Sequence, residues 1–209
     1  MEPNQNRARN LLPAIIITVL SMIQALALEL YWTKIGESDF LWQGGWSAAI
    51  GWMQLLLMFL GMLLIWILYI SVVLRFSWLP SMEDTLIPFF IGLLEFGMID
   101  LMGPETLGPW FLLLAATFAI TTLANHMAMR RARKDPANNY FFDGIEPANL
   151  RDYSVTIAAC FTLAIFGLML WVWSNPPVLS CLALLLALAA LSRQMHQARR
   201  YWMHSLSTD

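Results

Sequence analysis

Long runs of apolar residues, separated by short polar segments, make up most of the chain. A helix that crosses the hydrocarbon core of a bilayer needs roughly 20 mostly apolar residues. Six stretches meet this requirement, at about residues 11–31, 47–74, 85–102, 109–128, 153–174 and 177–193. The pattern predicts an all-α protein, a polytopic membrane bundle in which a single transmembrane domain has six transmembrane helices.

The overall composition agrees with a membrane protein. Of the 209 residues, 59% are hydrophobic and 12% are charged, against about 45–50% and about 25% in soluble domains. The mean hydropathy is +0.61. A soluble domain of this size could not bury so many large apolar side chains in one core, whereas a bilayer accepts them on the outside of the fold.

The positions of Lys and Arg predict the orientation of the spans. Eleven of the twelve basic residues fall on one side of the six-span arrangement, and only Lys34 falls on the other. The positive-inside rule makes the richer side cytoplasmic, and so predicts a cytoplasmic N-terminus and a cytoplasmic C-terminus. One missed span would invert every later loop and scatter the charges, so the charge split supports the count of six.

Aromatic residues are expected at both membrane interfaces. Trp78 and Trp202 are predicted at the inner interface. The set predicted at the outer interface comprises Tyr31, Trp32, Trp42, Trp46, Trp110, Trp171 and Trp173.

The first span shares features with a secretory signal peptide. Arg7 and Arg9 precede an apolar run that contains the small-residue pattern Ala25-Leu26-Ala27, which is typical of a cleavage site. We expect the segment to be retained as a signal anchor.

Short turns on the outer side predict two helical hairpins. Gly103-Pro104-Glu105 joins spans three and four, and Ser174-Asn175-Pro176-Pro177 joins spans five and six. Such turn residues favour tight connections. Spans three and four, and likewise spans five and six, are therefore expected to be antiparallel neighbours.

The cytoplasmic loop 129–152 is the largest predicted polar segment. It holds two acid-Pro-Ala-Asn strings, at 135–138 and 146–149, and each is expected to open a helix because an acid followed by proline suits a helix start. The aromatic cluster Tyr140, Phe141 and Phe142 is a candidate partner-binding site; the alternative is a loop folded back on the bundle.

Residues 194–209 form a basic amphipathic cytoplasmic tail. Its basic residues and its apolar positions fall on different sides of a helix, so we expect it to lie along the membrane surface.

Glu95 is the most informative ionisable residue, because it falls near the middle of span three. A charged group inside a bilayer is costly, and by default suggests function. A carboxyl group in dry surroundings favours its protonated form, so Glu95 could exchange protons near neutral pH. Thr117 and Thr121 share a face of span four, and Thr117 lies about level with Glu95. The alternative is a structural hydrogen bond between Glu95 and one of these threonines.

Glu29 and Asp100 lie near the outer ends of spans one and three. Together with further acids in the outer loops they would concentrate cations at an outer mouth. The functional hypothesis is a proton or cation path that passes Glu29 and Asp100 and reaches Glu95. The alternative is that both acids are merely interfacial.

No familiar catalytic, nucleotide-binding or metal-binding motif is present, so we expect no enzyme of a familiar class, no metal and no cofactor. The charge balance gives no reason to expect nucleic acid as a partner. Cys160 and Cys181 lie at different depths, which disfavours a disulfide.

Two functions remain from the sequence. The first is a proton or small-cation channel or transporter with Glu95 as its mid-membrane carboxylate. The second is a non-transporting membrane subunit, sensor or effector that acts through loop 129–152 and the tail. In both cases we expect a multi-pass protein of a cell membrane, in particular the bacterial inner membrane. Its partners would be the lipid bilayer and either further copies of the chain or other membrane subunits.

Overall fold

The computed structural model describes the backbone of residues 3–78, 81–149 and 151–206, and the side chains of 11, 14–78, 81–149 and 151–200. The described part is all-helical, with no β-strand. Its elements are α1 (Pro3–Glu37), η1 (Asp39–Leu41), α2 (Gly45–Arg75), α3 (Met82–Asp100), α4 (Leu107–Ala132), η2 (Pro136–Asn138), α5 (Asn139–Phe142), α6 (Ser154–Val172) and α7 (Pro177–Leu206).

Five of the helices are long and apolar enough to cross a membrane: α1, α2, α4, α6 and α7. The sixth long helix, α3, has the same length as α6 but carries the acidic residues Glu83, Asp84, Glu95 and Asp100. These charges lower its hydropathy, so length and composition do not by themselves mark α3 as a span.

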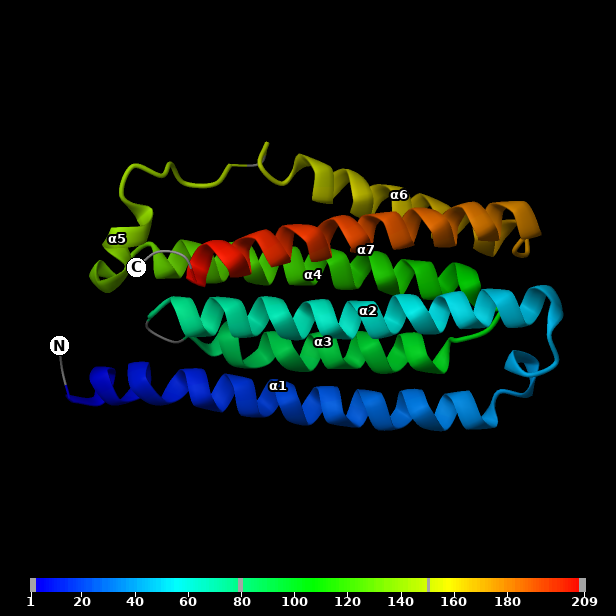
Figure 1. The fold of residues 1–209 in the computed structure, drawn as a ribbon, viewed down its shortest axis with the longest axis horizontal. Helices are drawn as coiled ribbons and strands as arrows, with labels where there is room; N and C mark the ends of the chain where they lie inside the picture. The colour runs from blue at the N-terminus through cyan, green and yellow to red at the C-terminus, as the bar shows by residue number, and fades with distance from the viewer. Residues whose placement is uncertain (1–2, 79–80, 150, 207–209) are drawn as a thin grey trace.

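The six long helices run alternately up and down one axis (Figure 1). The start of α1, the end of α7, the end of α2, the start of α3 and the loop that contains α5 lie together, and we call this the basic end because it carries the Arg-rich segment 130–134. The opposite end carries Glu37, Asp39, Asp100 and Glu105, and we call it the acidic end.

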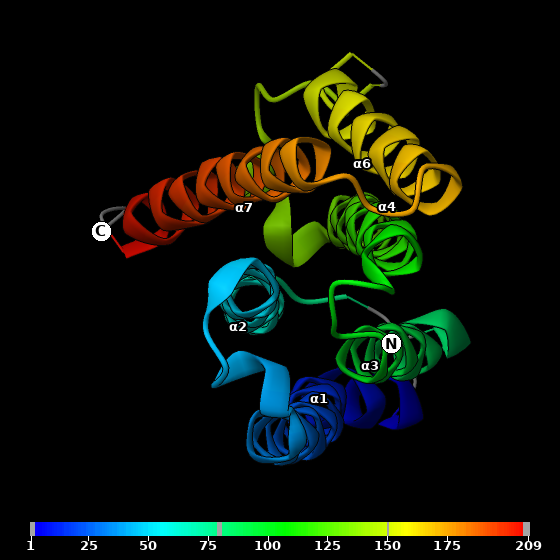
Figure 2. The same ribbon diagram turned by 90° about the vertical axis from the view of Figure 1, so that its right-hand side faces the viewer.

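Seen along the bundle, α1 packs on α2 and α3, α4 lies between α3 and α6, and α7 lies beside α2 (Figure 2). The antiparallel pairing of α3 with α4 and of α6 with α7 confirms both predicted hairpins. In the second hairpin Ser174 and Asn175 adopt positive φ values of 55° and 57°, which is the left-handed conformation that ends a helix sharply.

Glycines bring α4 and α6 into close contact. A Cβ atom at Gly108 would lie 2.6 Å from the backbone nitrogen of Trp171, and one at Gly167 would lie 3.1 Å from the carbonyl oxygen of Gly108. Small residues at such crossings let two backbones approach closely, which maximises van der Waals contact where lipid provides no hydrophobic driving force.

Trp110 departs from the predicted outer aromatic belt. Its side chain is fully buried, at 0% exposure, and packs edge-on against Phe111 at 5.3 Å between ring centroids. The Trp110 ring therefore faces the interior of the bundle and not lipid, because the first turn of α4 lies between its neighbours; its depth at the outer interface stays a prediction. The side chain of Trp202 lies outside the described residues.

Only the first acid-Pro-Ala-Asn string opens a helix. Asp135 accepts a hydrogen bond from the backbone N–H of Ala137 at 3.0 Å and caps η2. The second string lies in a non-helical stretch, and α6 begins later, at Ser154. There the side chains of Asn149 and Asp152 bond to nearby backbone N–H groups and form turns instead.

At the other end of the chain, α7 continues through the predicted tail to Leu206. The last apolar stretch and the tail therefore form one helix. Cys160 and Cys181 are both free thiols, in agreement with the sequence analysis.

Candidate functional site

Glu95 lies deep inside the bundle, with 1% of its surface exposed. Its partner is Gln24 of α1, whose side-chain amide nitrogen Nε2 donates hydrogen bonds to both carboxyl oxygens at 2.9 Å. Gln24 is also buried, at 7% exposure. Among the described residues no Lys, Arg or His forms an ion pair with Glu95. In the described part of the chain, one amide therefore supplies the hydrogen bonds that this carboxyl group accepts.

A cavity of about 30 Å³ lies beside Glu95 between α2, α3, α4 and α7, and we call it the central cavity. Thr117 and Thr121 line it together with Gln194 and a set of apolar side chains. The two threonines thus share the face predicted from their spacing. Their hydroxyls donate to the carbonyl oxygens of Leu113 and Thr117, at 2.9 and 2.8 Å, so their lone pairs remain able to accept hydrogen bonds.

A second cavity, of about 50 Å³, extends toward the basic end, and we call it the lower cavity. Its polar lining comprises Tyr69, Asp84, Thr121 and Asn125. Thr121 also lines the central cavity, as do Ile65 and Leu68. The two cavities therefore adjoin at this shared set of side chains.

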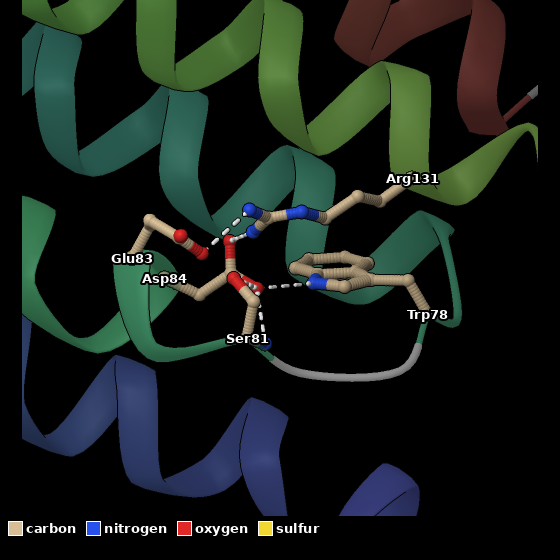
Figure 3. Close-up of polar contacts among 5 residues, drawn as sticks. All are labelled: Trp78, Ser81, Glu83, Asp84 and Arg131. Atoms are coloured by element: carbon tan, nitrogen blue, oxygen red, sulfur yellow. Dashed lines mark hydrogen bonds and ion pairs between the residues drawn. The ribbon is translucent and has the colours of Figure 1, made fainter.

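Five polar and aromatic residues converge where the lower cavity ends, as Figure 3 shows. The carboxylate of Asp84 accepts hydrogen bonds from the indole N–H of Trp78 at 3.1 Å and from the backbone N–H of Ser81 at 3.0 Å. Ser81 and Asp84 form the capping box that begins α3. The guanidinium group of Arg131, from α4, bonds to Asp84 and, at 2.9 Å, to Glu83.

The environments of the two neighbouring acids differ. Asp84 is buried at 7% side-chain exposure, whereas 57% of the Glu83 side chain is exposed. A hydrogen bond from Ser81 and the positive charge of Arg131 lower the pKa of Glu83 below its ordinary value. Two carboxyl groups thus share one guanidinium at the basic end of the lower cavity.

The remaining acids of the predicted path lie elsewhere. Glu29 is exposed on α1 and Asp100 is exposed at the end of α3, and neither lines the two cavities. The ammonium group of Lys34 donates to the backbone carbonyl of Asp100 at 3.0 Å. The structure therefore brings Thr117 and Thr121 together with Glu95 but leaves Glu29 and Asp100 on the outside of the bundle.

In the aromatic cluster of the loop, Phe141 and Phe142 both pack against Phe76, with ring centroids 5.0 and 5.5 Å away. Guanidinium groups cover the two rings, since Arg75 lies 4.1 Å from the Phe141 centroid and Arg133 lies 4.6 Å from that of Phe142. Tyr140 remains 73% exposed.

Sequence reasoning missed Gln24, Asp84 and Arg131. Gln24 is a polar side chain within an apolar run, and such residues often hydrogen-bond across helices in membranes, so a signal was available. For Asp84 the signal was the Ser81-x-x-Asp84 capping pattern before an apolar run. No sequence signal linked Asp84 to Arg131, 47 residues away.

The arrangement as a whole joins a buried carboxyl group to two water-sized cavities and an ion-paired end. Among the described residues, no three His, Cys, Asp or Glu side chains come together as a metal site. No protein-family model matches the chain, and no curated protein or solved structure is significantly similar to it.

Proposed function

We propose that the chain is a six-span protein of a cell membrane that moves protons, with Glu95 as the group that takes up and releases them. The observation that carries the proposal is a carboxyl group at 1% exposure, held by one neutral amide and bordered by a cavity large enough for water. A charge at the centre of a membrane helix costs about 2.5–3.5 kcal/mol on insertion scales. Proton uptake by Glu95 removes that cost, and a nearby water could deliver the proton.

The six-span arrangement counts α3 as a span. Since α3 lies between helices that are themselves apolar enough to cross, its acids need not face lipid: Glu95 is inside the bundle, and Glu83, Asp84 and Asp100 lie in its first and last turns. The gathering of the start of α1, the end of α7 and the Arg-rich segment at the basic end supports a cytoplasmic position for that end.

Protons are favoured over larger cations by the scarcity of ligands. A dehydrated monovalent cation needs several oxygen ligands in place of its hydration shell. The central cavity offers Glu95 and the hydroxyls of Thr117 and Thr121, whereas most of its other lining is apolar. A proton needs only one acceptor at a time.

Proton flux into proteoliposomes, followed with a pH-sensitive dye under an imposed gradient, tests the proposal. Glu95→Gln preserves the size of the side chain and removes its exchangeable proton, so we expect flux to fall at least tenfold. Glu29→Gln makes the same chemical change on an exposed carboxyl group and is the matched control; its flux should equal that of the native protein. Absence of proton flux from correctly folded native protein would refute the proposal, and a panel of monovalent cations would then follow.

A second candidate function is a membrane subunit or sensor that binds a partner through Tyr140. The specific observation is that Tyr140 is 73% exposed while its two aromatic neighbours anchor the loop to the bundle. In that case Tyr140→Ala would abolish partner capture and leave the stability of the protein unchanged, and Glu95→Gln would have no effect on capture.

A further inference from the structure

We infer that in this conformation Glu95 exchanges its proton with the basic end alone, through a chain of water molecules bound in the central and lower cavities, and that release to the other end during transport requires a second conformation. The inference rests on the proposed proton exchange at Glu95 and gives it a direction. It assigns Thr121, Asn125 and Tyr69 as binding residues for that water. Access past Glu29 and Asp100, expected from the sequence, has no part in it.

The first argument is the position of the cavities. Glu95 and Asp84 lie eleven residues apart on α3, so about 16 Å along the helix axis separates them at 1.5 Å per residue. The central cavity includes Glu95 and the lower cavity includes Asp84, and both include Thr121. Together they span the distance from the middle of the bundle to its basic end.

The second argument is the size and polarity of the space. A water molecule needs about 10–15 Å³ of cavity volume and two to four polar partners. Cavities of about 30 and 50 Å³ therefore have room for roughly two and three water molecules. In the described part of the chain neither the Asn125 amide nor the Tyr69 hydroxyl has a protein hydrogen-bond partner, although both line the lower cavity. Water in that cavity would satisfy both groups.

The third argument is the contrast with the acidic end. Beyond Glu95 in that direction lie the buried side chains of Ile99, Met102, Leu107, Trp110 and Phe111, all at 5% exposure or less, and the buried amide of Gln54, which accepts a hydrogen bond from the backbone N–H of Gly103 at 3.1 Å. Neither of the two cavities extends among these side chains, as expected for a closely packed region. The two cavities thus lead from Glu95 toward the basic end, whereas a closely packed, mostly apolar layer, the dry layer, lies toward the acidic end.

One cluster at the otherwise basic end, where the lower cavity meets Glu83, Asp84 and Arg131, suits a positively charged species. Glu83 and Asp84 share the single guanidinium group of Arg131, so this cluster has one carboxyl group more than it has cations. A negative balance raises the local concentration of hydronium and other small cations.

Silver ion is a suitable probe, because it is small, soluble in water and binds thiols; the S–Ag bond forms as the thiol releases its proton, with no change of oxidation state. In a background of Cys160→Ala and Cys181→Ala, single cysteines are introduced as Thr117→Cys, Asn125→Cys and Ile99→Cys. Silver nitrate is added to right-side-out or to inverted membrane vesicles. The thiol left unreacted is then counted with a maleimide after denaturation.

Two further variants identify which side each end of the bundle faces. Asp143 is exposed in the loop at the basic end and Asp39 is exposed at the acidic end. Asp143→Cys and Asp39→Cys therefore report their side through a membrane-impermeant maleimide.

The side on which the maleimide labels Asp143→Cys is the side that the basic end faces. We expect silver added on that side to react with the thiols of Thr117→Cys and Asn125→Cys at least tenfold faster than silver added on the opposite side. Ile99→Cys lies one turn beyond Glu95 in the dry layer, so its thiol should not react with silver added on either side. Gly61 lines the central cavity, and a Cβ atom there meets nothing within 4 Å. Adding Gly61→Leu should fill that cavity and protect Thr117→Cys, while Asn125→Cys in the lower cavity keeps its reactivity.

Equal blocking of Thr117→Cys from both sides, or from neither side, overturns the inference. The readout requires no transport. Silver access from one side without proton flux would refute the proposed function and support the water route. Proton flux together with silver access from both sides would support the proposed function and refute the one-sided water route.

Discussion

Asp84 and Glu83 are adjacent acids that bond to the same guanidinium group, yet the structure predicts very different effects when each loses its charge. Asp84→Asn leaves the shape of the side chain almost unchanged but places an amide where Arg131 requires an acceptor. It also weakens the capping box at Ser81 and the bond from Trp78. The perturbation is thus confined to charge and hydrogen bonding.

The magnitude follows from burial. Removing one partner of a buried ion pair typically costs about 3–5 kcal/mol, because the other charge is left uncompensated. Arg131 keeps 22% side-chain exposure and its second partner Glu83, so part of that cost is recovered through solvent. We expect Asp84→Asn to lower the free energy of unfolding by about 2–4 kcal/mol.

Glu83→Gln is the matched control, since it makes the same chemical change one residue away. Exposed ion pairs are screened by solvent and contribute little, so this variant should lose far less stability than Asp84→Asn. The assay is reversible unfolding in mixed micelles by SDS titration, followed by tryptophan fluorescence. A loss of stability in Glu83→Gln equal to that in Asp84→Asn would refute the reasoning, because burial would then not decide the effect.

A double-variant cycle separates the pair from its surroundings. If Asp84 and Arg131 interact directly, Asp84→Asn combined with Arg131→Gln should cost less than the two single changes together, with a coupling of about 0.5–3 kcal/mol. Additive losses would mean that Asp84 acts mainly as the cap of α3.

Three further predictions concern packing, the loop and pH. Gly108→Ala should destabilise the protein by about 1–3 kcal/mol, because the new methyl group would overlap the backbone of Trp171; Gly61→Ala, which meets open space, is the control and should unfold like the native protein. The side chain of Asn138 is 2% exposed and forms three hydrogen bonds of 2.6–3.1 Å to the backbone, worth about 2–4 kcal/mol together. Asn138→Ala should therefore detach the loop and make it sensitive to limited proteolysis. Native-like protease resistance would contradict this prediction. Folding lowers the pKa of Glu83. The small contribution of Glu83 to the stability of the folded protein is therefore present above the ordinary pKa of glutamate and is lost as pH falls through the lowered pKa. Glu83→Gln should remove this part of the pH dependence of the unfolding midpoint.

The sequence predicted the helices well and the local turns partly. In a bilayer each backbone N–H and C=O group must be satisfied within its own segment, so the length of an apolar run is enough to predict a helix, as at α2, α4 and α6. The acid-Pro-Ala-Asn signal at 146–149 failed because Asn149 and Asp152 satisfied nearby backbone groups in turns. Competition of this kind between local hydrogen bonds is hard to rank from sequence.

What the sequence determined by itself was thus the helical class, the order of the helices and the presence of one costly carboxyl group, Glu95, in an apolar run. Only the tertiary structure decided that Gln24, 71 residues away, would be its partner, that Arg131 would meet Asp84, and that the cavities would lie toward the basic end. These outcomes depend on how each helix is rotated and shifted against its neighbours. Side-chain packing between distant segments sets that rotation, and the spacing of residues along one helix does not contain it.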